Sequence, residues 1–208
     1  MATGGVWITG LGAIGPQGVG FGALQQLIDT PRACFSSSPP DWAEMAGAPD
    51  AWIAPLDEAG EQIVRSTETV STDRATALAL IAAGEAWTHA GLHTAPDAAP
   101  ETDRHRAGIY WGTGMGGLHT TETSYRRTMV ERGLPRPMTV VRIMGNSAAA
   151  HLAIKYKLHG PNATYTVACA SSAMALGEAM LAIRAGRIDL ALVGGSEAML
   201  MPGVMAAW

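Results

Sequence analysis

The chain has 208 residues and a formal net charge of −4; 48% of its residues are hydrophobic and 15% are charged. This composition supports one folded domain with a sizeable core and excludes collagen-like and disordered chains. No apolar run is long enough to cross a membrane, and the first residues lack the features of a secretory signal, so we expect a cytoplasmic protein. The acidic balance argues against a nucleic-acid partner.

The first third of the chain predicts a strand, a loop and a helix, followed by an irregular segment. Residues 6–9 form a short apolar run that ends at glycines, and residues 21–28 have apolar side chains at helical spacing. Residues 30–72 are richer in Pro, Ser and Asp and show no sustained period. We therefore predict an irregular excursion there, with at most a short strand near Trp52 and Ile53.

The remaining two thirds alternate between strand and helix patterns. Ser71 or Thr72 is the expected cap of a helix over 73–90 that Gly91 closes. The later predicted strands are 107–112, 163–168 and a fully buried strand at 188–195, and the later predicted helices are 118–132, 142–156 and 170–185. Such alternation favours an α/β fold with a mainly parallel sheet, and we take residues 1–208 as a single domain.

Two glycine-rich segments, GLGAIG at 10–15 and GTGMGG at 112–117, match the G-x-G-x-x-G pattern of dinucleotide-binding proteins. The first is followed by proline and a further glycine-rich loop rather than by a helix, and no acidic residue ends a second strand about 20 residues later. A nicotinamide-dependent oxidoreductase therefore remains a weak alternative. The other interpretation is that these glycines allow close packing or line a crevice at the strand ends.

Cys169 is the more informative residue. The two cysteines, Cys34 and Cys169, have neither the spacing of a disulfide framework nor that of a metal site, so we expect no metal. Cys169 ends a predicted strand and opens a helix whose first turn has small side chains. A thiol there meets unpaired N–H groups and the positive end of the helix dipole, which can stabilise an oxyanion. The alternative is an inert buried thiol.

Several segments, in this order, resemble one enzyme family: VWITGLGAIGPQG, TDRAT, GIYWGTGMGGL and the block from GNSAAAHLAIKY to VGGSEAML. They are similar to the N-terminal half of a β-ketoacyl-acyl carrier protein synthase, and more narrowly to the type II-like ketosynthases of fatty acid and polyketide synthesis. The resemblance covers nearly the whole chain and is weakest over 30–70. It implies a thiolase-like fold, here the N-terminal half of a duplicated α/β/α/β/α layered structure whose sheet lacks its last strand.

The resemblance also implies roles for two residues. Cys169 falls on the nucleophile that takes an acyl chain from the phosphopantetheine of an acyl carrier protein before decarboxylative condensation with malonyl-acyl carrier protein. Met115 falls at the mouth of the acyl pocket, where a side chain influences chain length. A methionine that only fills the core is an equally good interpretation of this position. No cofactor is implied beyond the phosphopantetheine that carries the substrates.

The family's two catalytic histidines lie in motifs beyond residue 208, so we expect the chain alone to be inactive in condensation. A non-catalytic partner subunit similar to chain-length factors is an alternative, although such subunits lack the nucleophile. The strand at 163–168 corresponds to the dimer strand of the family, implying a homodimer or a heterodimer with a ketosynthase-like subunit. The segment RSTE before TDR is not basic, so carrier docking would depend on Arg136 and its neighbours Arg126, Arg127 and Arg132.

Overall fold

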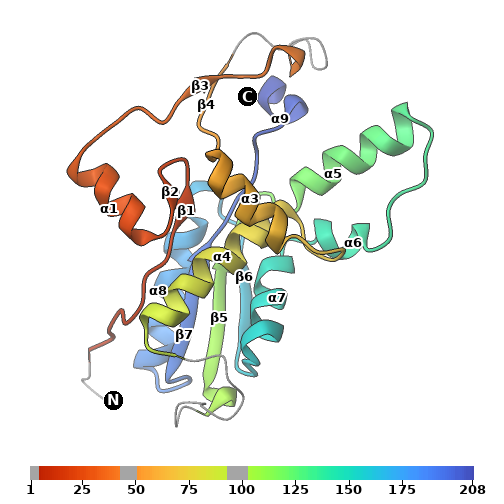
Figure 1. The fold of residues 1–208 in the computed structure, drawn as a ribbon. Helices are drawn as coiled ribbons and strands as arrows, with labels where there is room; N and C mark the ends of the chain where they lie inside the picture. The colour runs from red at the N-terminus through yellow and green to blue at the C-terminus, as the bar shows by residue number, and fades with distance from the viewer. Residues whose placement is uncertain (1–4, 43–50, 93–102) are drawn as a thin grey trace.

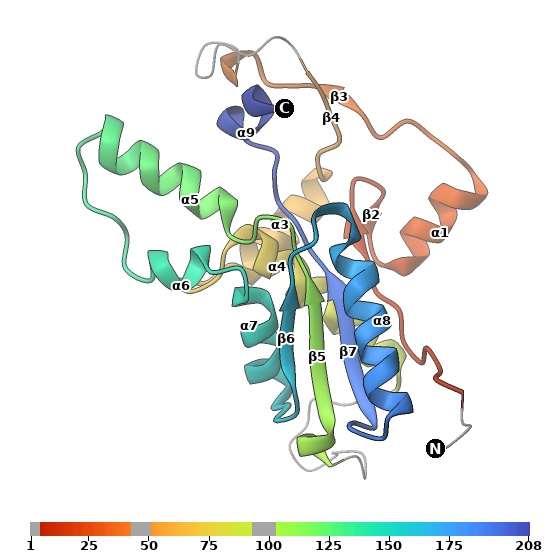
Figure 2. The same cartoon turned by 180° about the vertical axis from the view of Figure 1, so that it is seen from behind.

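The computed structural model describes residues 5–42, 51–92 and 103–208. Its centre is a parallel sheet in the order β6-β5-β7, made of β6 (Asn162–Tyr165), β5 (Ala107–Gly112) and β7 (Leu190–Gly195). Helices α4 (Arg74–His89) and α7 (Ser147–Tyr156) cover one face, and α8 (Ser171–Arg184) covers the other (Figures 1 and 2). The parallel α/β prediction is confirmed.

Alternation of side chains along β5 divides the core into two parts. Ile109 and Trp111 join the cluster formed with α4 and α7, whereas Tyr110 faces the small side chains of α8. Every residue of β5 is buried, as expected for a central strand covered on both faces. The predicted strand at 188–195 also forms, as β7, but its prediction as fully buried is wrong. It is an edge strand in which only Leu192 is buried, because no described residue pairs with its outer side.

The predicted helices beside the sheet form, with one change of cap. The side chain of Asp73, rather than that of Ser71 or Thr72, accepts the N–H of Ala75 at 2.9 Å at the start of α4. The helix ends at His89, and Gly91, two residues later, has a φ of 70°. Helix α8 is preceded by a 3-10 turn, η3 (Ala168–Ala170), and ends before Gly186, which has a φ of 66°.

The strand predicted at residues 6–9 does not form. The residues that follow it are instead held against α4, where the N–H of Leu11 donates to His89 at 3.1 Å, and Trp7 and Ile8 are 82% and 71% exposed (Figure 1). The glycines that follow serve close packing, since a Cβ on Gly10 or Gly12 would lie 2.0 Å from a backbone oxygen of α4. A short hairpin, β1 (Ile14–Gly15) and β2 (Gly18–Val19), leads to the predicted helix α1 (Phe21–Asp29).

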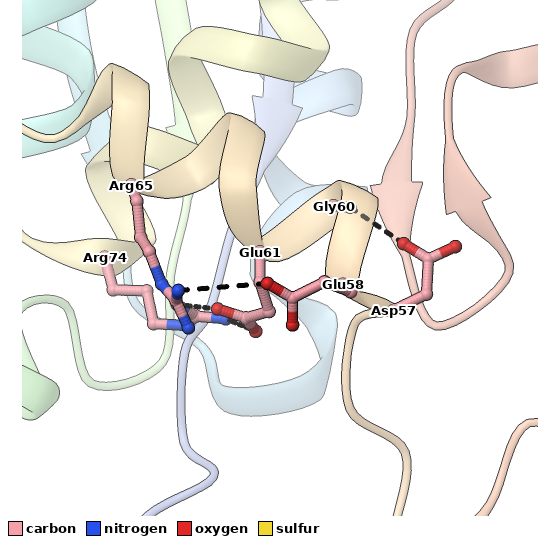
Figure 3. A network of polar contacts seen from close by, with 6 residues as sticks. All are labelled: Asp57, Glu58, Gly60, Glu61, Arg65 and Arg74. Atoms are coloured by element: carbon pink, nitrogen blue, oxygen red, sulfur yellow. Dashed lines mark hydrogen bonds and ion pairs between the residues drawn. The ribbon is translucent and has the colours of Figure 1, made fainter.

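The segment predicted as irregular, 30–72, holds more structure than expected. The predicted short strand is β4 (Trp52–Ile53), which pairs with β3 (Ser36–Ser37). Helix α3 (Glu58–Thr67) was not predicted; the carboxylate of Asp57 caps it by accepting the N–H of Gly60 at 2.8 Å. Arg74 at the start of α4 donates two hydrogen bonds to the carboxylate of Glu61 on α3, and this ion pair joins the two helices (Figure 3). This pairing brings the segment to the carboxyl-terminal side of the sheet.

Residues 118–143 form an arm that projects from the body and returns to it, before α7 packs on the sheet (Figure 1). The predicted first helix is α5 (Leu118–Tyr125), extended by a π-helical turn η2 (Arg126–Val130). The predicted second helix is broken into α6 (Thr139–Ile143) and α7, because Gly116 packs against Gly145 at the break, where a Cβ on Gly116 would lie 2.8 Å from the Cα of Gly145.

Two further short helical elements are η1 (Arg104–Arg106), before β5, and α9 (Pro202–Ala207), at the carboxyl end. At the opposite end of the sheet from the strand carboxyl ends, Arg106 and Asp189 form an exposed ion pair with contacts of 2.6 Å. This hydrogen-bonded pairing holds the pKa of Asp189 below its usual value. Within the described ranges, none of the helices is both long and apolar enough to span a membrane.

Candidate active site

Three loops meet at one edge of the sheet because the strands they follow are parallel. The segment Thr113 to Gly117 follows β5, the turn that carries Cys169 follows β6, and Glu197 follows β7. Both sequence-predicted site residues, Cys169 and Met115, therefore lie at this edge, on segments joined by a hydrogen bond from the hydroxyl of Ser171 to the carbonyl of Thr113.

Cys169 lies in a turn with unusual backbone geometry. Its side chain is exposed, which excludes the interpretation of a buried inert thiol. Ala168, immediately before it, has a φ of 48°, in the left-handed region that residues other than glycine seldom adopt. Such a conformation costs about 1–3 kcal/mol and persists only where surrounding contacts hold it. The exposed thiol is thus presented on a turn that the rest of the fold maintains against strain.

Glycines allow the beginning of α8 to lie directly against the ends of two strands. A Cβ on Gly112, at the end of β5, would lie 2.5 Å from backbone atoms of Ser171 and Ser172. A Cβ on Gly195, at the end of β7, would lie 1.9 Å from the hydroxyl oxygen of Ser172 on α8 and 2.9 Å from the carbonyl oxygen of Gly112. No larger residue fits at either position without moving the helix start, so these two glycines fix the height of Cys169 above the sheet.

The GTGMGG loop binds an internal carboxylate. The N–H groups of Gly114 and Met115 donate to Oε2 of Glu197 at 2.5 and 3.1 Å, and the hydroxyl of Thr113 lies 3.4 Å from the same oxygen. Successive N–H groups of this kind form a nest for an anion. Because Glu197 occupies the nest, this loop is not arranged to receive a pyrophosphate. Met115 itself is 57% exposed, so it is not a core-filling residue of the described chain.

A buried carboxylate anchors the other end of the loop. Asp73 is fully buried, and its second oxygen, Oδ2, accepts the N–H and the hydroxyl of Thr120 at 2.9 and 2.6 Å. Because Asp73 also caps α4, it joins the start of α4 to the first turn of α5. Two carboxylates, Asp73 and Glu197, therefore fix the position of the segment that carries Met115.

A cleft of about 460 Å³ lies beside this loop, on the side of α3 and the β1–β2 hairpin. Its wall is mostly apolar, and Glu197, His119 and the Arg74–Glu61 ion pair contribute polar groups. Cys169 is not part of its lining. Across residues 5–42, 51–92 and 103–208, no cluster of three or more His, Cys, Asp or Glu side chains is arranged to hold a metal ion.

His119 lines this cleft, whereas the other described histidines have partners elsewhere in the fold. His151 contacts the hydroxyl of Ser71 at 3.1 Å and the carbonyl of Ser147 at 2.8 Å, on the α4–α7 side of the sheet. His105 and His159 pack on each other near the amino end of β5, and His89 contacts Leu11. His93 lies outside the described residues.

The predicted basic segment is partly used within the arm. Arg127 donates to the carbonyl of Leu134 at 2.7 Å, and Arg126 pairs with Glu131 at 3.5 Å. Arg132 has a φ of 55°, and Arg136 is exposed. These contacts explain the local structure of the arm. The role of these arginines in docking an acyl carrier protein stays a prediction.

Reasoning from the sequence missed the residues that support the site. Ser171, Glu197 and Asp73 were not identified, although Glu197 and Asp73 occupy positions with a signal. Glu197 is an acidic residue just after a strand that ends in two glycines, and Asp73 comes directly before a strong helix. The role of Ser171 has no comparable sequence signal, because a small polar residue in the first turn of a helix is common.

The family model described as "Beta-ketoacyl synthase, N-terminal domain" matches residues 4–208. The chain belongs to the β-ketoacyl synthase family. Nodulation protein E of Rhizobium leguminosarum bv. trifolii is 34% identical over 206 residues, which are 98% of this chain and 49% of that protein. The chloroplastic 3-oxoacyl-[acyl-carrier-protein] synthase I of Hordeum vulgare is 34% identical over 125 residues, 59% of this chain and 27% of that protein.

Solved structures of ketosynthases share the fold. A type II polyketide ketosynthase bound to the hexaketide, in complex with its acyl-carrier protein, matches with a TM-score of 0.81 and 27% identity over 96% of this chain and 47% of its own. The ishigamide ketosynthase/chain length factor matches with a TM-score of 0.76 and 25% identity, over 92% of this chain and 47% of that chain. The predicted thiolase-like ketosynthase fold is confirmed. The chain spans about half the length of the Rhizobium relative and of both ketosynthase structures.

Proposed function

We propose that this β-ketoacyl synthase chain carries the acyl-accepting cysteine of a condensing enzyme, and that Cys169 is this nucleophile. The observation that carries the proposal is the exposed thiol on a strained turn at the start of α8, at the edge of the sheet where three loops meet. The family membership supports it, because enzymes of this name build 3-oxoacyl chains on acyl-carrier protein.

In the proposed first step, the thiolate of Cys169 attacks the carbonyl carbon of an acyl chain held as a thioester on acyl carrier protein. The carbon–sulfur bond to phosphopantetheine breaks, its thiol takes a proton, and the acyl group is left on Cys169. The negative oxygen of the tetrahedral intermediate needs hydrogen-bond donors, and we assign the backbone N–H of Cys169 as one of them. In the second step, malonyl thioester loses carbon dioxide, its α-carbon attacks the acyl carbon, and the thiolate is released.

Met115 is proposed to stand at the entrance to the acyl pocket. It is exposed, and the backbone of its loop is held by Glu197 on one side and by the contact between Thr113 and Ser171 on the other. A flexible thioether at this point can admit or obstruct a growing chain. The loop is therefore the part of this chain that would influence acyl-chain length.

The partners proposed for this chain are acyl carrier protein and a ketosynthase-like subunit. One structural relative is a ketosynthase in complex with its acyl-carrier protein, and another pairs a ketosynthase with a chain length factor. Strand β6 is an edge strand of the described sheet, with an outer side available for pairing with a second subunit. The alternative role as a chain-length-factor-like subunit is favoured by the second relative, and it predicts that Cys169 is dispensable.

The test is the formation of β-ketoacyl product from acyl- and malonyl-carrier proteins by the assembly that contains this chain. Replacement Cys169→Ser is expected to abolish product, whereas the matched replacement Cys34→Ser leaves the rate unchanged. Undiminished product with Cys169→Ser would exclude the nucleophile assignment and favour the non-catalytic role.

A further inference from the structure

Ser171 makes the contacts that close the turn around Cys169. It is the first residue of α8 and is 3% exposed. Its hydroxyl oxygen accepts the N–H of Val167 at 2.8 Å, and it lies 2.7 Å from the carbonyl oxygen of Ala168 and 3.2 Å from that of Thr113. One buried side chain therefore contacts the two residues that precede Cys169 in the turn, Val167 and Ala168, and also the loop that follows β5.

The chemistry of a hydroxyl explains why serine suits this position. A hydroxyl has one hydrogen to donate and two lone pairs to accept with, so it satisfies an N–H and a carbonyl oxygen at the same time. The shorter contact assigns the hydrogen to Ala168, with the carbonyl of Thr113 as the second acceptor within reach. If the hydroxyl is removed, the N–H of Val167, in the turn that carries Cys169, loses its hydrogen-bond acceptor.

The backbone conformation of the turn requires support of this kind. Ala168 has a φ of 48°, which an alanine adopts only where surrounding contacts hold it. Ser171 holds the residues on either side of that torsion, Val167 through its N–H and Ala168 through its carbonyl. The Thr113 carbonyl is itself fixed, because the N–H of Thr113 donates to Tyr165 at 3.0 Å and its hydroxyl faces Glu197.

We propose that Ser171 is a positioning residue for acyl transfer: its hydroxyl holds the strained turn that aims the Cys169 thiol and joins this turn to the loop that carries Met115. The inference rests on the proposed function, because it assumes that Cys169 accepts the acyl group. It adds that the orientation of the thiol, as distinct from its exposure, depends on one buried hydroxyl.

The experiment compares two reactions of Cys169 by intact mass and peptide mapping. Acylation by hexanoyl-N-acetylcysteamine requires an oriented thiol and an oxyanion site, whereas alkylation by iodoacetamide requires mainly an accessible thiol. The variants Ser171→Thr and Ser171→Val form a matched pair of nearly equal size that differ in the hydroxyl. Ser171→Ala removes the hydroxyl without adding volume, and Ser172→Ala, at the exposed neighbouring serine, is the control.

We expect acylation of Cys169 to fall about ten-fold in Ser171→Ala and Ser171→Val, with alkylation within about two-fold of the wild type. Ser171→Thr restores acylation, and Ser172→Ala matches the wild type. Equal acylation of the threonine and valine variants overturns the inference, as does unfolding of both the alanine and valine variants while the threonine variant folds. A wild-type chain that is alkylated but never acylated refutes the proposed function itself, a result distinct from the failure of Ser171 alone.

Discussion

Substitution of Gly112 by alanine tests whether the position of α8 controls the reactivity of Cys169. The added Cβ would lie 2.5 Å from the carbonyl carbon of Ser171 and the nitrogen of Ser172, whereas ordinary contacts begin at 3.4 Å. These neighbours are backbone atoms, so no side-chain rotation relieves the clash. The start of α8 must therefore move by about 1 Å away from β5, a displacement that can lower the rate of an oriented reaction about 100-fold.

The effect on stability has two opposing contributions. Alanine in place of glycine stabilises a strand by about 0.5–1 kcal/mol, because the unfolded chain loses freedom. Overpacking in a well-packed region costs about 1–3 kcal/mol. Since the clash at Gly112 is with backbone on a helix that is also packed against β7, we expect a net loss of about 1–2 kcal/mol in the free energy of unfolding.

The assay measures urea unfolding and the rate of acyl transfer to Cys169 for Gly112→Ala beside a matched control on α8. A Cβ on Gly177 would meet nothing within 4 Å, so Gly177→Ala should stabilise the chain by up to about 1 kcal/mol and leave acylation unchanged. If Gly112→Ala is as stable as the wild type and is acylated at the same rate, the close contact between β5 and α8 does not position the thiol.

Three further predictions concern residues around the core and the loop. The hydroxyl of Tyr156 is buried without a hydrogen-bond partner among the described residues, and burial raises its pKa to about 12. The unfolded tyrosine ionises first, so wild-type stability should fall by up to about 2 kcal/mol relative to Tyr156→Phe as the pH rises from about 10 to about 12; equal urea midpoints at pH 7 and 11 in both proteins would contradict this. Asp73→Ala removes the cap of α4 and two hydrogen bonds to Thr120, so a loss of about 3 kcal/mol is expected in urea unfolding, with a smaller loss for Asp73→Asn; a loss below about 1 kcal/mol would refute the anchoring role. Glu197→Ala frees the N–H groups of the Met115 loop and should broaden the range of acyl chain lengths transferred to Cys169 in a competition between short and long thioesters, more than Glu197→Gln does; an unchanged product distribution would exclude control by this loop.

Local patterns of the sequence predicted the elements that contain the site. The run from Ala107 to Gly112 is apolar and bounded by polar residues and glycines, and it forms the buried central strand. The position of Cys169 between a strand and a helix of small residues was also readable, because the change of period occurs at that residue. These features depend only on residues that are neighbours in the sequence, so contacts with distant parts of the chain do not alter them.

Features that depend on distant partners could not be predicted. Residues 6–9 have the composition of a strand, but they pair with no described strand, and the residues that follow them pack against α4. Ser171 contacts Thr113, 58 residues away, and Glu197 contacts Gly114, 83 residues away. Both pairs meet only because the parallel strands bring their carboxyl ends to the same edge of the sheet. Helix α3 is different, because its own sequence offers a cap in Asp57 and a basic residue, Arg65, in its last turn, and these signals were missed.

The central claim is that Cys169 takes the acyl group from a carrier protein, and the most direct measurement is peptide mapping after mixing the chain with acyl-loaded acyl carrier protein. We predict a mass increase equal to the acyl group on the peptide that contains Cys169, removable by hydroxylamine as a thioester, with the peptide of Cys34 unmodified. An acyl group found on Cys34, or on neither cysteine while the carrier stays loaded, would contradict the account.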